Sequence, residues 1–311
     1  MDLEFGAADE AFRAEVRAWL REHVPSGPLP SLETAEGFAA HRDWERTLGR
    51  ARLGVVSWPA EYGGRGTSVL RWLIFEEEYY RADAPSRVTQ NGIFLLAPTL
   101  FEFGTEEQRR RILPRMASAD DLWAQGWSEP GAGSDLASVR SRAVRDDVRG
   151  GWRVTGQKTW TTRGAYCSHL FGLFRSDPDA ERHRGLTYLM LALDAPGVTV
   201  RPFERLDGDP GFADVYLDDV FVPDEDVIGA VNGGWRVAMA TTGSERGLTL
   251  RAPGRFRRQV ERLLEFAEQN PAAVTSAVRE RLIDSWIDAE AYQLFTLDQV
   301  TRIVDGDVLG A

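Results

Sequence analysis

The hydrophobic period of this 311-residue chain changes twice along its length. Up to about residue 120, apolar residues such as Phe12, Val16 and Leu20 recur about every three to four positions, which is the spacing of amphipathic helices. Between Leu122 and Val227 the apolar runs are short, rich in Val, Phe, Tyr and Thr, and separated by turn residues, which predicts successive strands. After Asn232 the helical period returns. The order predicts an α+β fold. We expect three domains: an N-terminal all-helical domain (1–120), a middle antiparallel β domain (121–230) and a C-terminal helical domain (231–311).

Two local signals refine the N-terminal helices. Thr105 precedes Gln108 by three residues, which is the spacing of a capping box at a helix start. In the helix expected over residues 68–82, apolar residues occupy one face. The acidic run from Glu76 to Glu78 is therefore predicted to face water.

Composition excludes several classes of protein. The net charge of −11 argues against a nucleic-acid-binding protein, because such proteins carry basic surfaces. No apolar run approaches the ~20 residues of a membrane span, and we see no signal peptide. The single cysteine, Cys167, cannot form an internal disulfide, which favours a cytoplasmic location. The acidic cluster from Asp218 to Asp226 does not have the spacing of a calcium loop, so we interpret it as a solvated hairpin face and expect no metal site.

The stretch from Leu122 to Thr162 carries the most chemistry. It opens as LWAQGWSEPGAGSD, which reads as a strand ending in a tight loop. It closes as GWRVTGQKTWTT, which we interpret as a hairpin with its turn at Gly156. Together the two edges present tryptophans and hydroxyls, a combination that suits a planar heteroaromatic ring needing stacking and hydrogen bonds. The alternative is that Trp127 and Trp160 are ordinary sheet core.

Five segments in this order and spacing resemble the acyl-CoA dehydrogenase family of flavoenzymes. They are WPAEYGGRG (58–66), QGWSEPGAGSD (125–135), GQKTWTT (156–162), LDDVFVPDEDVIG (217–229) and NGGWRVAM (232–239). The resemblance covers nearly the whole chain and thins after about Leu250. It implies an oxidoreductase of lipid metabolism that uses FAD for the α,β-dehydrogenation of an acyl-CoA thioester. A carboxylate base removes the α-proton, flavin N5 accepts the β-hydride, and an electron-transfer flavoprotein takes the electrons.

The resemblance also assigns roles to residues. Gln125 to Ser128 fall where the family lines the flavin ring, with Ser128 at its pyrimidine side. Trp160 falls where an indole packs on the isoalloxazine, and Thr162 where a hydroxyl or amide reaches N5. Ser134 falls where a serine contacts the CoA arm. The cofactor-binding residues expected on this basis are Gln125, Trp127, Ser128, Trp160, Thr161 and Thr162.

The resemblance places the catalytic base on the helix that follows the β domain, as in a minority of the family. Glu245, in TTGSERGLTL (241–250), falls at that position. Arg246 falls where the family keeps an arginine beside the base, so it is expected to hold the carboxylate or the substrate. The alternative is a surface glutamate paired with an arginine.

Two departures from the family pattern concern the C-terminal part. The Arg-x-x-Phe-Gly segment that binds the pyrophosphate of a neighbouring subunit's FAD is missing from residues 266–282. The chain also stops short of the family's usual end, so we expect either an incomplete chain or a partner that supplies the last helices in a homo- or hetero-oligomer. Two other functions stay open: a non-catalytic subunit of a heteromeric dehydrogenase, and a flavin oxidase or monooxygenase.

Overall fold

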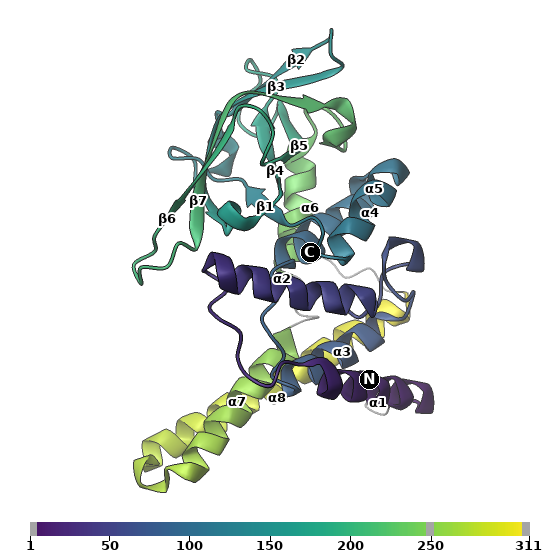
Figure 1. The fold of residues 1–311 in the computed structure, drawn as a ribbon, viewed down its shortest axis with the longest axis vertical. Coiled ribbons are helices and arrows are strands. Elements are labelled where there is room, and N and C mark those ends of the chain that lie inside the picture. The colour runs from purple at the N-terminus through teal and green to yellow at the C-terminus, as the bar shows by residue number, and fades with distance from the viewer. Residues whose placement is uncertain (1–4, 247–251, 307–311) are drawn as a thin grey trace.

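The computed structural model describes residues 5–246 and 252–306, and it describes the backbone alone for Ser244, Glu245, Arg246 and Ala252. A β sheet forms one end of the molecule, the N-terminal helices form the middle, and a C-terminal helical hairpin projects from the other end (Figure 1). The N-terminal part contains α1 (Ala7–His23), α2 (Ala35–Arg50), η1 (Ala60–Tyr62), α3 (Val69–Arg81), the π-helical turn η2 (Gly92–Leu96), α4 (Ala97–Phe103) and α5 (Glu106–Ala117).

The start of α5 confirms the predicted capping box. The Thr105 hydroxyl accepts a hydrogen bond from the Gln108 backbone N–H at 3.1 Å, and the Gln108 side-chain oxygen accepts one from the Thr105 N–H at 2.9 Å. The Gln108 side-chain nitrogen also donates to the carbonyls of Glu225 at 2.8 Å and Val227 at 2.7 Å. One buried amide therefore connects the first turn of α5 to the end of the sheet.

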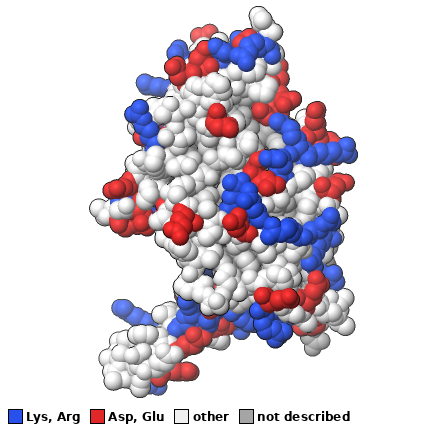
Figure 2. All heavy atoms as spheres, viewed as in Figure 1, with Lys and Arg blue, Asp and Glu red and all other residues white. Residues whose placement is uncertain are grey.

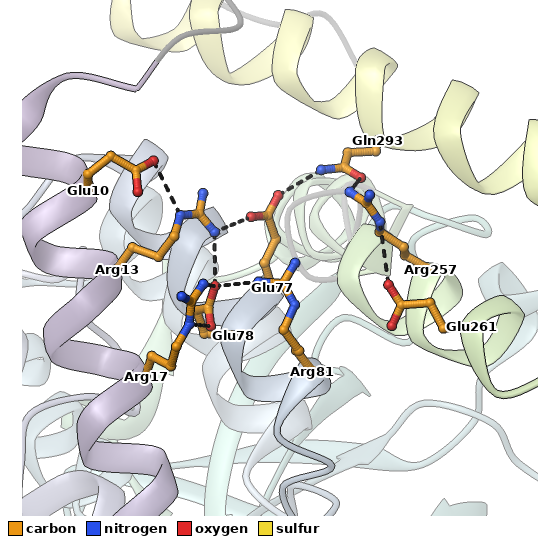
Figure 3. A network of polar contacts seen from close by, with 9 residues as sticks. All are labelled: Glu10, Arg13, Arg17, Glu77, Glu78, Arg81, Arg257, Glu261 and Gln293. Atoms are coloured by element: carbon orange, nitrogen blue, oxygen red, sulfur yellow. Dashed lines mark hydrogen bonds and ion pairs between the residues drawn. The ribbon is translucent and has the colours of Figure 1, made fainter. Parts of the chain in front are cut away.

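The prediction that Glu76 to Glu78 face water is wrong. Glu76 and Glu78 are each 2% exposed and Glu77 is 9% exposed. Helix α1 packs on the side of α3 that carries Glu77 and Glu78, and Glu76 lies 3.7 Å from Arg87. Arg13 and Arg17 of α1 donate hydrogen bonds to the Glu78 carboxylate at 3.2 and 2.9 Å (Figure 3). The acidic run is buried because arginines from other parts of the chain reach it.

The sheet is mostly antiparallel, with strand order β6-β7-β3-β2-β4-β5-β8 and with β1 paired to β4. Strands β1 and β4 pair in parallel, and β2 and β3 come between them along the chain. The strands are β1 (Trp123–Gly126), β2 (Arg142–Asp146), β3 (Gly151–Thr162), β4 (His169–Arg175), β5 (Leu186–Ala192), β6 (Val198–Phe203), β7 (Phe212–Pro223) and β8 (Val227–Ile228). Short 3-10 turns, η3 (Leu136–Ser138), η4 (Gly164–Tyr166) and η5 (Asp224–Asp226), connect some of them.

The predicted hairpin with a turn at Gly156 is wrong. Strand β3 runs unbroken from Gly151 to Thr162 and pairs along most of its length with β7. Gly156 marks an irregularity in that pairing, not a chain reversal. A Cβ atom at Gly156 would lie 2.2 Å from the Ser141 hydroxyl oxygen, so the glycine serves a close approach between neighbouring strands.

The C-terminal part contains α6 (Gly234–Arg246), α7 (Ala252–Gln269), η7 (Pro271–Ala273) and α8 (Ser276–Val304). Helix α6 packs against β5, η2 and α4, and its Val237 and Ala238 belong to the largest core cluster, which the helices and the sheet share. Helices α7 and α8 pack antiparallel and rest on α3. Among the described residues, no helix combines the length and the apolar content needed to cross a membrane.

Candidate active site

Two segments of the middle sheet meet at the exit of β1. The Thr159 N–H of β3 donates a hydrogen bond to the Ser128 carbonyl at 2.9 Å, so the loop that follows β1 lies against the C-terminal half of β3. This contact places Ser128 beside Thr159, one residue before Trp160. The loop itself is closed by a two-way backbone pairing between Glu129 and Ala132.

A buried ion pair between Lys158 and Glu129 holds the loop after β1 against β3. The Lys158 ammonium lies 2.8 Å from the Glu129 carboxylate and also donates to the Leu173 carbonyl at 2.7 Å. The same carboxylate accepts hydrogen bonds from the backbone N–H groups of Arg140 at 2.6 Å and Ser141 at 3.0 Å. Burial acts to raise the pKa of Glu129, but Lys158 and these donors outweigh it and hold the pKa below its ordinary value. The sequence interpretation did not assign a role to either residue.

The backbone of Trp160 adopts a left-handed conformation, with φ of 57°, at a break in the pairing of β3 with β7. This conformation is strained for an aromatic residue and is typical of a functional position. The bulge turns the indole outward, so that it is 60% exposed. Its ring meets Phe203 and Phe212 edge to face, at centroid distances of 5.2 and 5.5 Å. The structure therefore contradicts the alternative that Trp160 is sheet core.

Several buried polar atoms on β1 and β3 lack a hydrogen-bond partner among the described residues, and two of them belong to predicted cofactor contacts. They are the side-chain nitrogen of Gln125, on β1, and the hydroxyl of Thr161, on β3. Unsatisfied buried polar groups are rare in folded proteins and are explained where a ligand completes them. The exposed indole of Trp160 fits stacking on a planar ring, whereas the Thr161 side chain is completely buried.

The other predicted contacts differ from one another in burial. Trp127 is half-buried and packs against the largest core cluster. Ser128 and Thr162 are half-buried. Ser134 is exposed, next to Asp135, which forms an ion pair with Arg182 at 2.8 Å. The structure does not test these roles, which stay predictions.

The predicted base follows the buried part of α6. Thr241 is completely buried, with its hydroxyl 2.8 Å from that of Thr99 and 3.3 Å from that of Tyr188. Glu245 comes one helical turn later, and α6 ends at Arg246. The side chains of Glu245 and Arg246 lie outside the described residues. The structure thus places the backbone of both residues on the last turn of a helix that packs on the sheet.

Comparison with known proteins identifies the relatives of this chain. Models of the N-terminal, middle and C-terminal domains of acyl-CoA dehydrogenase match residues 7–120, 124–220 and 232–311. The chain belongs to the acyl-CoA dehydrogenase family. Family members are flavoproteins that use FAD.

Individual relatives support the assignment. Acyl-CoA dehydrogenase IpdE1 of Mycobacterium tuberculosis (strain H37Rv) is 42% identical over 296 residues, which span 93% of this chain and 76% of that protein. The solved "Tcur3481-Tcur3483 steroid ACAD" has a TM-score of 0.84 at 31% identity, covering 99% of this chain and 79% of its own. The ChsE4-ChsE5 complex from Mycobacterium tuberculosis has a TM-score of 0.78 at 29% identity, with 99% and 79% covered. This acyl-CoA dehydrogenase therefore shares its fold with the steroid ACAD and with a chain of the ChsE4-ChsE5 complex.

Proposed function

We propose that this member of the family catalyses the α,β-dehydrogenation of an acyl-CoA thioester with FAD as its cofactor. The observation that carries the proposal is the strained, outward-facing indole of Trp160. An indole that served only the fold would be buried. The exposed indole instead offers a stacking face for a flat ring.

The residues of this site divide into those that stack and those that hydrogen-bond. Trp160 offers an indole face, whereas Gln125, Ser128, Thr161 and Thr162 offer amides and hydroxyls. When bound, FAD supplies the acceptor for the hydride that leaves the substrate's β-carbon. Lys158 and Glu129 keep the two protein edges in register, so that these groups are already in place before the cofactor binds.

In this proposal the carboxylate of Glu245 takes the α-proton of the thioester, and Arg246 holds the carboxylate or the substrate. The buried contacts of Thr241 with Thr99 and Tyr188 support the assignment, because they fix the helical turn that leads to Glu245. A carboxylate is a weak base in water, so removal of the α-proton requires a site from which water is excluded.

The absorbance spectrum of the purified chain tests the proposal. We expect a yellow protein whose flavin absorbance bleaches when an acyl-CoA is added without oxygen. Glu245→Gln is expected to keep the yellow colour and to lose bleaching by at least about a thousandfold in rate, because the proton acceptor is gone. Glu268→Gln, an exposed glutamate on α7, is the matched control and should bleach like the parent. Bleaching by Glu245→Gln at the parental rate would exclude that residue as the base.

Further proposals concern partners. The ChsE4-ChsE5 structure is a complex, and the steroid ACAD also carries two names, which supports assembly of this chain with a second, unlike subunit. A non-catalytic subunit is the second candidate function: a colourless chain that turns yellow and active only with another polypeptide would favour it.

We propose an electron-transfer flavoprotein as the electron acceptor, and oxygen uptake in its absence would instead indicate an oxidase.

A further inference from the structure

A chain of buried hydroxyl groups lies where α6 packs on both the sheet and the N-terminal helices. The Thr241 hydroxyl of α6 lies 2.8 Å from the Thr99 hydroxyl of α4 and 3.3 Å from the Tyr188 hydroxyl of β5. Each of these three side chains is at most 1% exposed, and Tyr188 belongs to the largest apolar cluster. Hydroxyls cost free energy in such surroundings unless they are hydrogen-bonded, so three of them in one place call for an explanation.

The carbonyl acceptors around these hydroxyls indicate which group donates. Each hydroxyl carries one proton. The Thr99 hydroxyl has an acceptor in the Leu95 carbonyl at 2.8 Å, and the Thr241 hydroxyl has one in the Val237 carbonyl at 2.9 Å. Tyr188 has no carbonyl acceptor of this kind among the described residues. Its proton is therefore the one available for the contact with Thr241, and Tyr188 is the donor to α6.

The Tyr188 hydroxyl also faces the loop that follows β1. Burial raises the pKa of Tyr188, whereas hydrogen bonding with Thr241 and with the indole of Trp127 acts to lower it. The Trp127 indole N–H is buried and has no other partner among the described residues. A phenol that donates its proton to Thr241 still has lone pairs with which to accept from this indole. Tyr188 thus lies between the segment expected to line the flavin and the helix expected to carry the base.

Tyr188 meets α6 at two places. A Cβ atom on Gly234, the first residue of α6, would lie 2.7 Å from the Tyr188 backbone nitrogen, so the first turn of the helix rests directly on β5. Thr241 comes seven residues later, about 10 Å along the helix axis. The side chain of Tyr188 therefore reaches along about two turns of α6, and its hydroxyl holds the second of these contact points.

The join beneath α6 uses neutral groups. On the molecular surface, basic and acidic side chains lie next to one another (Figure 2). A buried ion pair would carry a large desolvation cost, whereas hydroxyls that satisfy one another do not. A hydrogen bond also weakens steeply with distance and angle. A hydroxyl contact therefore fixes the position of the helix more narrowly than apolar packing alone.

A small rotation of α6 would displace the predicted base. Glu245 comes eleven residues after Gly234, about 16 Å along the helix. A pivot of about 4° around the first turn would move the backbone of Glu245 by about 1 Å. A misplacement of about 1 Å in a reacting group can lower a rate by about 100-fold. The turn that contains Thr241 is therefore a sensitive place at which to hold the helix.

We propose that Tyr188 is a positioning residue: its hydroxyl fixes the last two turns of α6 against the sheet and thereby sets where Glu245 stands relative to the loop that carries Trp127. Tyr188 touches neither substrate nor flavin in this account and acts through Thr241. The link to catalysis rests on the proposed function, in which Glu245 removes the α-proton. The placement of α6 itself is a property of the chain without ligands.

Hydrogen exchange of the full chain without flavin tests the placement of α6. Tyr188→Phe removes only the hydroxyl, and we expect the amides of residues 237–246 to exchange about tenfold faster, because one buried hydrogen bond no longer holds these turns. Tyr79→Phe is the matched control. Tyr79 is 1% exposed, and its hydroxyl accepts from the Trp44 indole and donates to the Pro85 carbonyl, away from α6. Its loss should leave exchange in α6 unchanged.

Anaerobic bleaching of the flavin-loaded chain tests the consequence for the base. At saturating acyl-CoA, Tyr188→Phe should bleach about tenfold more slowly than the parent, because the base is displaced. The half-saturating acyl-CoA concentration should stay within about twofold, because Tyr188 does not touch the substrate. Tyr79→Phe should bleach like the parent. This split between rate and binding separates a displaced base from general damage to the fold.

A second variant covers the case in which Tyr188→Phe does not fold. Thr241→Val breaks the same contact from the side of α6 and should give the same two changes. Where both fold, the double variant should bleach no more slowly than the slower single variant, because both remove one contact.

Two outcomes would overturn the proposal. The first is exchange in α6 that is no faster in Tyr188→Phe and Thr241→Val than in Tyr79→Phe. The second is faster exchange in α6 together with bleaching at the parental rate. A parent chain that does not bleach contradicts the proposed function instead, and exchange in α6 then decides by itself whether Tyr188 positions the helix.

Discussion

The ammonium of Lys158 lies 2.8 Å from the carboxylate of Glu129, and the two side chains are 0% and 8% exposed. Lys158 is the only lysine in a chain with 36 arginines. It lies two residues before Trp160, and Glu129 lies one residue after Ser128. The pair thus connects the two edges to which we assign flavin binding. A lysine fits here because its single ammonium can donate to both the carboxylate and the Leu173 carbonyl.

Lys158→Met is expected to destabilise the fold by about 3–5 kcal/mol, because it leaves a buried carboxylate without its cation. Urea unfolding measures the change. Arg153→Met, which removes an exposed ion pair with Asp219, should cost less than about 1 kcal/mol. The double variant Lys158→Met and Glu129→Met should be more stable than the single lysine variant, since both buried charges are then absent. Equal costs for Lys158→Met and Arg153→Met would contradict this account.

Trp160→Gly should separate folding from cofactor binding. Glycine adopts a φ of 57° without strain, and the indole is 60% exposed, so we expect the free energy of unfolding of the apoprotein to change little. Loss of the stacking surface should weaken FAD binding about tenfold. Titration of the apoprotein followed by flavin fluorescence provides the measurement, and Val148→Gly, at another exposed apolar side chain of the middle part, is the control. An unchanged affinity would remove Trp160 from the site.

Glu78 predicts a specific loss of stability in acid. Burial acts to raise the pKa of Glu78, but hydrogen bonds from Arg17 and the charges of the neighbouring arginines outweigh it, so its folded pKa lies below the ordinary value. A carboxylate of this kind stabilises the fold above its unfolded pKa of about 4.3, and the contribution is lost as the pH falls through the folded pKa.

The variant Glu78→Gln should therefore melt about 5 °C or more below the parent at pH 7, and this gap should narrow as the pH falls from 5 to 3. Thermal melts at several pH values record the gap. Glu22→Gln, at an exposed glutamate of α1, should melt with the parent at every pH. A gap for Glu78→Gln that is the same at pH 7 and pH 3 would show that the carboxylate does not act through its charge.

Cys167 should be inert in the native protein. Cys167 is half-buried beside the apolar core of the sheet, and desolvation there raises the pKa of its thiol to about 12. At pH 8 only about one molecule in ten thousand then carries the reactive thiolate. We expect iodoacetamide to label it in denaturant and not in buffer, as measured by mass spectrometry. Rapid labelling of the native protein would contradict the burial.

The hydrophobic period predicted most of the fold, because helices and strands repeat their apolar positions at different spacings. The spacing of apolar residues could not show which side chains a helix from another part of the chain would bring into contact. Glu76 to Glu78 read as a water-facing run until α1 supplies Arg13 and Arg17, which lie more than 60 positions earlier in the chain. The sequence predicted a turn at Gly156 because glycine is typical of turns, but glycine is also typical of places where two backbone segments approach closely. The position of Ser141 against Gly156 shows that the second reason applies.

The sequence singled out the two segments that the structure brings into contact. The contact between Thr159 and Ser128 joins two motifs that the sequence already singled out. The left-handed Trp160 was not predictable, since a bulge depends on the register of β7 against β3. The Lys158–Glu129 pair had a signal that sequence analysis did not use: a lone lysine in an arginine-rich chain marks a position where arginine does not fit.

The side chain of Gln108 has a mechanical consequence. Its oxygen completes the cap of α5, and its nitrogen donates to two carbonyls at the end of the sheet, just before the chain enters α6. If the sheet moved relative to α5, the hydrogen bonds of Gln108 to the sheet would break and the cap of α5 would be lost with them. Movement between the sheet and α5 is therefore coupled to fraying of the first turn of that helix.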